Sequence, residues 1–234
     1  MRIGILSDIH GNLPALEAVL ADMERRGVDR VVNLGDVAFR GPFPAECTVR
    51  VRQMGAPVIL GNTEVWLTEA EPKLPEALLA VRAWTRERMA PADLDWLAAL
   101  PAEFRLEVAG QRLLFAHGSP RSNMEFLFPF TPEADLKAAL AASAADVVVV
   151  GHTHWAFSRR IGQVHLIGAG SIGLPFDGDP RAAYAILEVT ERSVGVTHVR
   201  VAYDQERTVA AARESGFPDL GFLEYTVRKG QRPE

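Results

Sequence analysis

Short segments of this chain carry side chains of the kinds that bind metal ions. The donors lie, in chain order, at Asp8, His10, Asp36, Asn62, His117, His152 and His154. Four of the six histidines are among them. A mixture of carboxylate, imidazole and amide oxygen suits borderline or hard divalent ions better than soft ones. The donors are numerous enough to hold two neighbouring ions.

Two adjacent ions would give this site hydrolytic chemistry. Side chains two residues apart at the end of a strand point to the same side, so Asp8 with His10, and His152 with His154, can each chelate from one segment. An aspartate between two such clusters can give one oxygen to each ion, and Asp36 is the candidate. Ions roughly 3.5–4 Å apart lower the pKa of a shared water and neutralise charge on a phosphoryl group. The pattern therefore predicts hydrolysis of phosphate esters.

Any one of these motifs alone would be weak evidence. A single Asp-x-His or His-x-His is usually structural or exposed, and a lone Gly-Asp or Gly-Asn is usually a turn. The donors gain weight together, because each follows an expected strand and they occur in series.

The first part of the chain alternates buried strands with helices. Asn12 is suited to cap a helix whose apolar spacing continues until Gly27 stops it. The predicted elements are a strand over 2–7, that first helix, a strand over 30–34, a helix over 44–54 and a short strand over 57–60. A βαβαβ pattern favours a parallel sheet, and such sheets place their sites at the carboxyl ends of the strands.

The second part of the chain is richer in strands. Residues 75–100 are expected to be helical and to serve packing. We predict a hairpin from 104–108 and 112–116, a helix over 131–142, a strand over 146–150, two hairpins that turn near 162–163 and 190–193, and a helix over 204–216. The tail, 226–234, is polar and is expected to be frayed.

Composition indicates an ordinary globular protein. With 234 residues and 48% hydrophobic content, one domain over 1–234 is expected. The net charge of -5 gives no electrostatic reason to expect nucleic acid as a partner. Cys47 is the only cysteine, so an internal disulfide is excluded. No run approaches the roughly 18 apolar residues of a membrane span, and the N-terminal apolar stretch is too short for a signal peptide. We therefore expect a cytoplasmic protein without membrane contact.

The full set of motifs resembles that of the calcineurin-like metallophosphoesterase superfamily, in its compact bacterial and archaeal phosphodiesterase branch. The resemblance covers nearly the whole chain. It rests on Ser7-Asp8-Ile9-His10-Gly11-Asn12, Leu34-Gly35-Asp36, Gly61-Asn62, His117-Gly118 and Gly151-His152-Thr153-His154, in the usual order.

This resemblance implies an α/β fold, a four-layer α/β/β/α sandwich with mixed sheets and a dinuclear site at the carboxyl edge of the strands. It implies that Asp8, His10 and His154 bind one ion, that Asn62, His117 and His152 bind the other, and that Asp36 bridges them. Asp36, Asn62 and His117 are also the expected catalytic residues. Two divalent ions are implied, manganese first, with iron, zinc, nickel, cobalt or magnesium as alternatives.

The sequence departs from the family pattern beside Asn62. Many members carry a histidine at the next position, which is thought to protonate the leaving oxygen, whereas this chain has Thr63. A threonine is not a general acid near neutral pH, and loss of such a group typically costs a factor of about 10²–10⁴. Substrates with poor leaving groups should suffer most. Glu64 could replace the acid, but an exposed glutamate at a helix start is the simpler interpretation.

Two arginines are candidates for contact with a substrate phosphate. Arg40 follows the bridging aspartate and Arg121 follows His117, and a guanidinium can bind phosphate with two parallel hydrogen bonds. A surface role is the alternative for both. The segment 119–132, with its apolar cluster at 124–128, is expected either to wall the substrate pocket or to pack in the core.

The expected function is metal-dependent hydrolysis of phosphodiesters or nucleotides, through attack of a metal-bridging hydroxide on a small phosphate ester. The alternatives are a protein phosphatase or nuclease on the same scaffold, and a binding scaffold that no longer turns over. An apolar cluster over 217–225 could dock on the chain's own core or on a second copy in a homo-oligomer.

Overall fold

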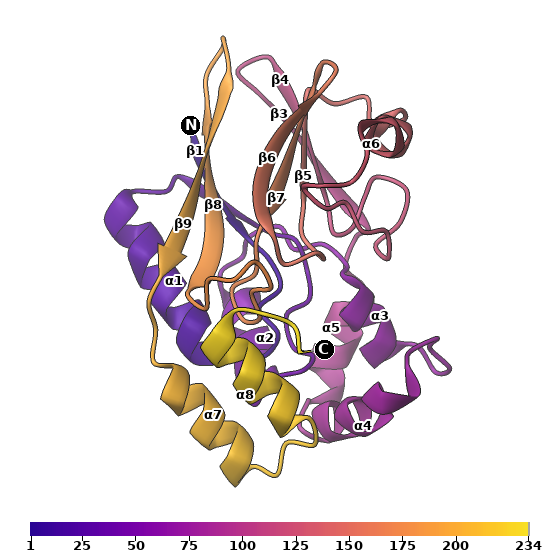
Figure 1. Ribbon diagram of the computed structural model, residues 1–234, viewed down its shortest axis with the longest axis vertical. Helices are drawn as coiled ribbons and strands as arrows, with labels where there is room; N and C mark the ends of the chain where they lie inside the picture. Colours follow the sequence, from indigo (N-terminus) through magenta and orange to yellow (C-terminus); the bar gives the residue numbers. More distant parts are fainter. Residues whose placement is uncertain (234) are drawn as a thin grey trace.

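The computed structural model describes residues 1–233, which form two β-sheets packed face to face (Figure 1). The first sheet has the order β2-β1-β8-β9, with β1 at Arg2–Leu6, β2 at Arg30–Asn33, β8 at Ala182–Val189 and β9 at Val194–Val201. The second has the order β3-β4-β5-β7-β6, with β3 at Glu103–Val108, β4 at Gln111–Ala116, β5 at Val147–Val150, β6 at Ala156–Ile161 and β7 at Val164–Ala169.

Both sheets are mixed. In the first, β1 pairs with β2 in parallel and with β8 in antiparallel orientation. In the second, β4, β5 and β7 run parallel, while β3 and β6 are antiparallel edge strands. The parallel strands β1, β2, β4 and β5 thus end at a common edge, as expected from the sequence.

Apolar side chains that alternate along the strands fill the space between the sheets. Ile3 and Ile5 of β1 pack there with Phe115 of β4 and Val149 of β5. Because successive strand residues face opposite sides, the other side of each sheet is available to helices.

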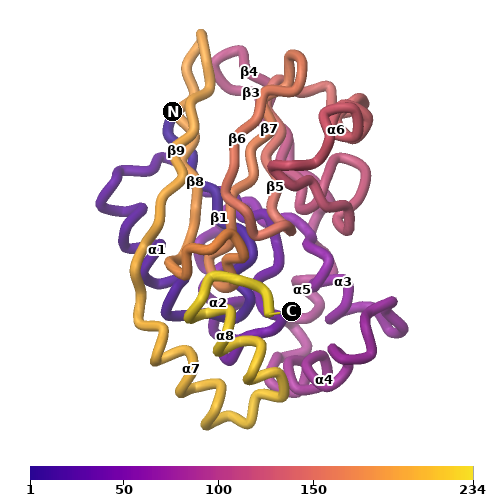
Figure 2. Tube along the Cα trace, in the orientation of Figure 1, coloured from indigo at the N-terminus to yellow at the C-terminus, as the bar shows by residue number. Residues whose placement is uncertain are grey.

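Helices cover both outer faces and complete four layers. The first sheet is covered by α1, Leu13–Arg26, and α2, Pro44–Gln53, and the second by α6, Glu133–Leu140. The side chain of Asn12 accepts a hydrogen bond from the backbone N–H of Ala15 and caps α1, and Gly27 ends this helix in a left-handed conformation. Figure 2 shows α1 and α6 on opposite sides of the paired sheets. The predicted four-layer α/β/β/α sandwich is confirmed.

The remaining helices gather at one end of the sandwich, below the strands in Figure 1. They are α3 at Asn62–Thr68, the short 3₁₀ turn at Glu76–Leu78, α4 at Leu79–Glu87, α5 at Pro91–Ala98, α7 at Gln205–Glu214 and α8 at Leu220–Lys229. They share an apolar cluster that includes Leu67, Trp84, Leu97, Val209 and Leu223. The cluster over 217–225 therefore packs mainly on the chain's own core.

Two predictions about elements were wrong. Residues 57–60 form only an isolated bridge between Val58 and Asn33, because Pro57 lacks an N–H and the N–H of Leu60 is bonded to the carbonyl of Pro101 instead. The tail is not frayed over 226–229, because α8 continues there and buries Val227 completely. The helix α8 was not predicted, and α3 was expected only as the helix start assigned to Glu64. Within residues 1–233, no helix is long and apolar enough to cross a membrane.

Candidate metal centre

The loops that follow β1, β2, β4 and β5 are joined by backbone hydrogen bonds. The N–H of Asp8 donates to the carbonyl of Gly35 at 3.1 Å, and that of His10 to the carbonyl of Asp36 at 2.9 Å. On the second sheet, the N–H of Gly151 donates to the carbonyl of His117 at 2.8 Å. Within each sheet, these bonds hold neighbouring donor segments together at the strand edge.

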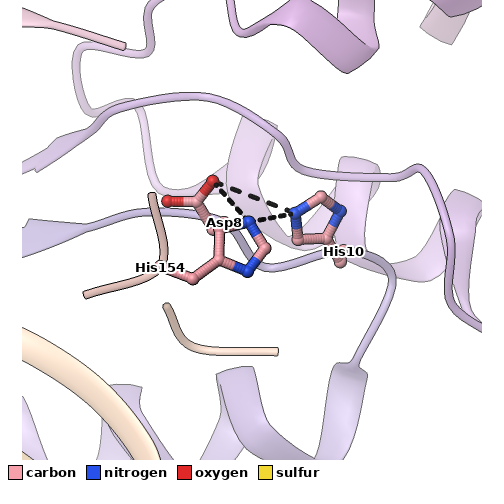
Figure 3. Close-up of side chains that lie close together, drawn as sticks. All are labelled: Asp8, His10 and His154. Atoms are coloured by element: carbon pink, nitrogen blue, oxygen red, sulfur yellow. Dashed lines mark hydrogen bonds and ion pairs between the residues drawn. The ribbon is translucent and has the colours of Figure 1, made fainter. Parts of the chain in front are cut away.

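Side chains from the first and the last donor segments along the chain form one group. Asp8, His10 and His154 place their ligand atoms within 4.8 Å of one another (Figure 3). The Nε2 atoms of the two histidines are 3.1 Å apart, and Asp8 Oδ1 lies 3.3 Å from His154 Nε2. All three side chains are buried.

A second group lies beside the first and shares Asp36 with it. Asp36, His117 and His152 also place their ligand atoms within 4.8 Å. Asp36 Oδ1 is 3.4 Å from His117 Nε2, whereas its Oδ2 is 3.6 Å from His10 Nε2 in the first group. Asn62 Oδ1 lies 2.9 Å from His117 Nε2. The carboxylate of Asp36 therefore faces one group with each oxygen.

The backbone is strained at most of these residues. Asp8, His10, Asp36, His152 and His154 have φ of 53°, 49°, 56°, 62° and 60°. Non-glycine residues rarely adopt this left-handed region, and each instance costs about 1 kcal/mol or more. Strain of this kind persists only where the surrounding structure fixes it, and it is concentrated at functional sites.

Three of the four donor histidines are oriented by backbone carbonyls. The Nδ1 of His10 is 2.8 Å from the carbonyl oxygen of Phe39, and that of His117 is 2.7 Å from the carbonyl oxygen of Leu34. His154 contacts the carbonyl of Leu174 in the same way. An N–H donated by Nδ1 to a carbonyl leaves Nε2 free to bind a metal, which is the usual outer support of a metal-binding histidine.

Buried polar atoms without partners fit a metal centre. Asp8 Oδ1 and His152 Nε2 are buried and make no hydrogen bond within residues 1–233. An unpartnered buried carboxylate oxygen is costly unless a ligand satisfies it. The donor set, carboxylate with imidazole and amide oxygen, also fits divalent ions.

The protonation states are compatible with metal binding. Burial lowers the pKa of both His10 and His152 to about 4, so both imidazoles are neutral at pH 7, as a ligand must be. Burial also disfavours the charged form of His117, but the neighbouring Asp36 outweighs it and raises the pKa to about 10. Nearby histidines hold the pKa of Asp36 far below its usual range despite burial. An ion at the second group would therefore displace a proton from His117.

Glu64 is neither exposed nor placed to act on a substrate, contrary to both sequence interpretations. Its side chain is fully buried, and its two oxygens accept hydrogen bonds from the N–H groups of Asp36 at 2.8 Å, Val37 at 2.7 Å and Gly61 at 2.9 Å. Burial, with the charge of Asp36, raises the pKa of Glu64 to about 7. This carboxyl joins the Asp36 loop to the start of α3 and thereby positions both Asp36 and Asn62.

Thr63 occupies the place beside Asn62 without a hydroxyl partner. Its N–H donates to Asp36 Oδ1 at 3.0 Å. Its Oγ1 is buried with no hydrogen bond in the part of the chain that the structure describes, and the residue lines the cleft above the metal groups. The residue thus borders the cleft, while its hydroxyl oxygen is enclosed by the protein.

Arg40 lies in the wall of the cleft but is already paired. Its Nε and Nη2 donate to Asp219 Oδ2 at 2.9 and 2.7 Å, and its guanidinium stacks on the ring of Phe222. A substrate phosphate would have to share this guanidinium with Asp219. The predicted substrate role of Arg40 therefore stays a prediction.

Arg121 lies at the surface, which was the alternative to a contact with substrate. Its guanidinium is largely exposed, pairs with Glu125, and lies outside the residues that line the cleft. The contact closes the loop after His117 onto itself. The predicted substrate role of Arg121 has no support in the structure.

The cleft above the metal groups has apolar walls. Its volume is about 300 Å³, and Met124 and Phe126 line it on one side while Trp66 and Phe176 line it elsewhere. The ring of Phe126 stacks on His152 with centroids 4.1 Å apart, and that of Phe176 stacks on His154 at 4.2 Å. The segment 119–132 therefore does both things foreseen for it, since Leu127 is buried in the core.

Comparisons with known proteins agree with this geometry. Residues 1–192 match the family model described as the calcineurin-like phosphoesterase superfamily domain. An uncharacterized protein of Methanocaldococcus jannaschii, MJ0912, is 28% identical over 93% of this chain and 94% of its own length. Phosphodiesterase YfcE of Escherichia coli is 29% identical over 80% of this chain and 88% of its own length. The crystal structure of a metallophosphoesterase from Sphaerobacter thermophilus has a TM-score of 0.83 and 31% identity, and covers 98% of this chain and 99% of that chain.

Proposed function

The chain belongs to the calcineurin-like phosphoesterase superfamily, and from this premise we propose that it is a metal-dependent phosphodiesterase acting on small phosphate esters. The observation that carries the proposal is the position of Asp36, whose two oxygens face two separate groups of donors. A carboxylate placed in this way is suited to join two ions.

We assign one ion to Asp8, His10 and His154 and the other to Asn62, His117 and His152, with Asp36 shared. Two bound divalent ions would lower the pKa of a shared water and neutralise charge on the phosphoryl group. Manganese is the ion we propose first, and the cytoplasm the compartment.

The protein's own contribution is to hold these donors still. Glu64 fixes the Asp36 loop through backbone N–H groups, and carbonyls orient His10, His117 and His154. Such outer contacts typically change metal affinity or activity by a factor of about 10–100. The strained left-handed conformations are maintained by the same contacts.

Thr63 makes diesters and activated esters the better substrates. No histidine stands at this position to protonate a leaving oxygen, and the Thr63 hydroxyl is not a general acid near neutral pH. Leaving groups that depart without a proton, such as nitrophenolate, avoid this deficit. The phosphodiesterase name of the Escherichia coli relative supports the same preference.

The test is hydrolysis of two chromogenic esters by protein loaded with manganese and, separately, with other divalent ions. We expect bis(p-nitrophenyl) phosphate to be cleaved faster than p-nitrophenyl phosphate, and a chelator to abolish both activities. If elemental analysis finds two ions per chain and neither ester is cleaved, the proposal is wrong and a binding scaffold remains. Parallel assays with single-stranded DNA and a phosphopeptide separate a nuclease or protein phosphatase from a small-ester hydrolase.

A further inference from the structure

A row of flat rings leads outward from the metal centre. Phe126 stacks on His152, Phe128 lies parallel to Phe126 with centroids 5.7 Å apart, and Phe130 lies parallel to Phe128 at 5.0 Å. The interplanar angles of the last two pairs are 5° and 7°. Trp155 meets Phe130 edge to face at 5.7 Å. We call Phe126, Phe128, Phe130 and Trp155 the aromatic ladder.

The ladder is apolar surface that the fold leaves exposed. Phe126 is 51% exposed and Phe130 is 68% exposed, whereas Leu127 between the first two rings is only 2% exposed. This alternation is typical of an extended segment with one side in the core and the other facing out. A contiguous exposed apolar patch beside a cleft usually marks a binding surface.

Hydrogen bonds from Arg159 and to Thr131 fix the backbone of the segment that carries the phenylalanines of the ladder. Arg159 of β6 donates from Nη1 to the carbonyls of Pro129 at 3.0 Å and Thr131 at 2.7 Å. The N–H of Phe128 donates to Thr131 Oγ1 at 2.9 Å, which closes a turn. The rings are thus held in place before a ligand arrives, and less ordering entropy is lost when one binds.

Three members of the ladder, Phe126, Phe128 and Trp155, line a second part of the cleft, and Phe130 packs against the last two of them. This part has a volume of about 360 Å³ and shares Phe126, His152, Phe176 and Arg232 with the part above the metal groups. Either volume alone is at the lower end of the range for small-molecule sites, about 300–1,000 Å³. The metal groups account for a phosphate, so the adjoining space remains for an organic substituent.

The walls indicate which substituent fits. The exposed aromatic side chains that line the second part of the cleft offer apolar surface against which a planar group can pack, and Arg232 and Lys73 add positive charge near the metal groups for an anionic ligand. A nucleobase joined through ribose to a phosphate combines a planar π-system with an anion. Stacking on aromatic side chains accepts any base, since each has a π-face.

We propose that the aromatic ladder binds the base of a nucleoside phosphodiester whose phosphate lies at the metal centre. This inference rests on the proposed phosphodiesterase function. It adds a substrate class, nucleotide-containing diesters, and assigns the base to the second part of the cleft.

Binding of AMP and ribose 5-phosphate to manganese-loaded protein tests the ladder, because these probes carry the same phosphate and differ in the base. We expect AMP to bind about 10-fold more tightly by calorimetry. AMP should also change the fluorescence of the protein, and this change should be lost in Trp155→Phe. Equal affinity for the two probes would overturn the proposal.

Phe128→Leu and Trp155→Leu, at two ladder residues that line only the second part of the cleft, then locate the effect. We expect each to weaken AMP binding severalfold and to leave ribose 5-phosphate binding unchanged, which also shows that the site is folded. Phe104→Leu, at a phenylalanine that lines neither part of the cleft, is the matched control and should retain the preference for AMP. If AMP affinity survives in both ladder variants, the ladder is not the base site.

The outcome is separable from that of the function itself. A protein that prefers AMP but cleaves no diester retains the base subsite and loses the proposed activity. A protein that cleaves bis(p-nitrophenyl) phosphate but binds both probes equally retains the activity and loses the base subsite.

Discussion

The two ends of the β-strands differ in how completely their carboxylates are hydrogen-bonded. At the end away from the metal groups, Asp146 precedes β5 and accepts hydrogen bonds from the backbone N–H, Nε and Nη2 of Arg112 at 2.9, 3.1 and 2.8 Å. At the site end, Asp8 Oδ1 is buried with no hydrogen-bond partner among residues 1–233. The carboxylate of Asp146 is thus fully hydrogen-bonded, whereas that of Asp8 keeps one oxygen without a hydrogen bond.

Backbone conformation differs in the same sense. Ala109 and Gly110, with φ of 52° and 71°, make the tight turn between β3 and β4, where a left-handed conformation is what the hairpin requires. At the site end, His152 and His154 adopt similar angles within a loop that their neighbours hold in place. The left-handed conformation forms a tight turn in the first case and positions the donor side chains in the second.

The largest effect should come from removing a charge at the site end. We expect Asp36→Asn to lower kcat/KM for bis(p-nitrophenyl) phosphate by about 10³-fold, because the carboxylate loses its charge and one of its two oxygens, each of which faces one donor group, becomes an amide nitrogen. Asp146→Asn, at the opposite end, should retain activity. Comparable loss in both variants would show that the two ends do not differ in function.

Metal removal should destabilise the protein, because the ions are proposed to bind only at the site end of the strands. Each ion at about 100 times its Kd would add about 2.7 kcal/mol to the free energy of unfolding, and a chelator would remove it. For a chain of this size, we expect the Tm to fall by about 5–10 °C for each ion removed. Thermal unfolding with and without chelator measures the change. An unchanged Tm would show that no ion binds at Asp8 Oδ1, the oxygen without a hydrogen bond.

Glu64→Gln tests how the site end is supported. The carboxylate of Glu64 accepts hydrogen bonds from backbone N–H groups, and in the variant an NH₂ group would face some of these donors. We therefore expect metal affinity to fall by about 10–100-fold. Manganese titration by calorimetry gives the value. Glu103→Gln, whose carboxylate pairs with Arg105 on the surface, is the control and should bind metal like the parent.

The smallest effect belongs to the far end and depends on pH. Hydrogen bonds from Arg112 lower the pKa of Asp146 to about 2, so its stabilising contribution is complete above its ordinary pKa of about 3.9 and fades as the pH falls toward 2. Its side chain is 39% exposed, which limits the contribution to about 1 kcal/mol or less. Urea unfolding should show a deficit for Asp146→Asn at pH 7 that shrinks at pH 3. A deficit that grows on acidification would reverse the assignment.

Patterns local in sequence were enough to predict much of the fold and the placement of the donors. Buried runs such as 147–150 are followed directly by His152 and His154, so strand and donor are visible together. Partnerships across the chain were not visible. Glu64 bonds to the N–H groups of Asp36 and Val37 on another loop, and an isolated glutamate at a helix start gives no sign of this.

Arg40 and the ladder show the same limit. The partner of Arg40 is Asp219, 179 residues away, and no spacing rule connects them. The apolar cluster that contains Phe126, Leu127 and Phe128 was visible in the sequence. Which side of that segment faces the core depends on Arg159 and on the position of β6, which only the folded chain supplies.

The contact between His10 and His154 joins residues 144 positions apart. Bringing such distant segments together costs loop-closure entropy, and contacts of long range form late in folding. The first group of donors is therefore incomplete until both sheets have assembled, and the N-terminal half of a growing chain can offer only part of it. An ion would then bind this site only in molecules that have completed folding. The fraction of purified molecules that retain metal would accordingly measure the fraction that folded completely.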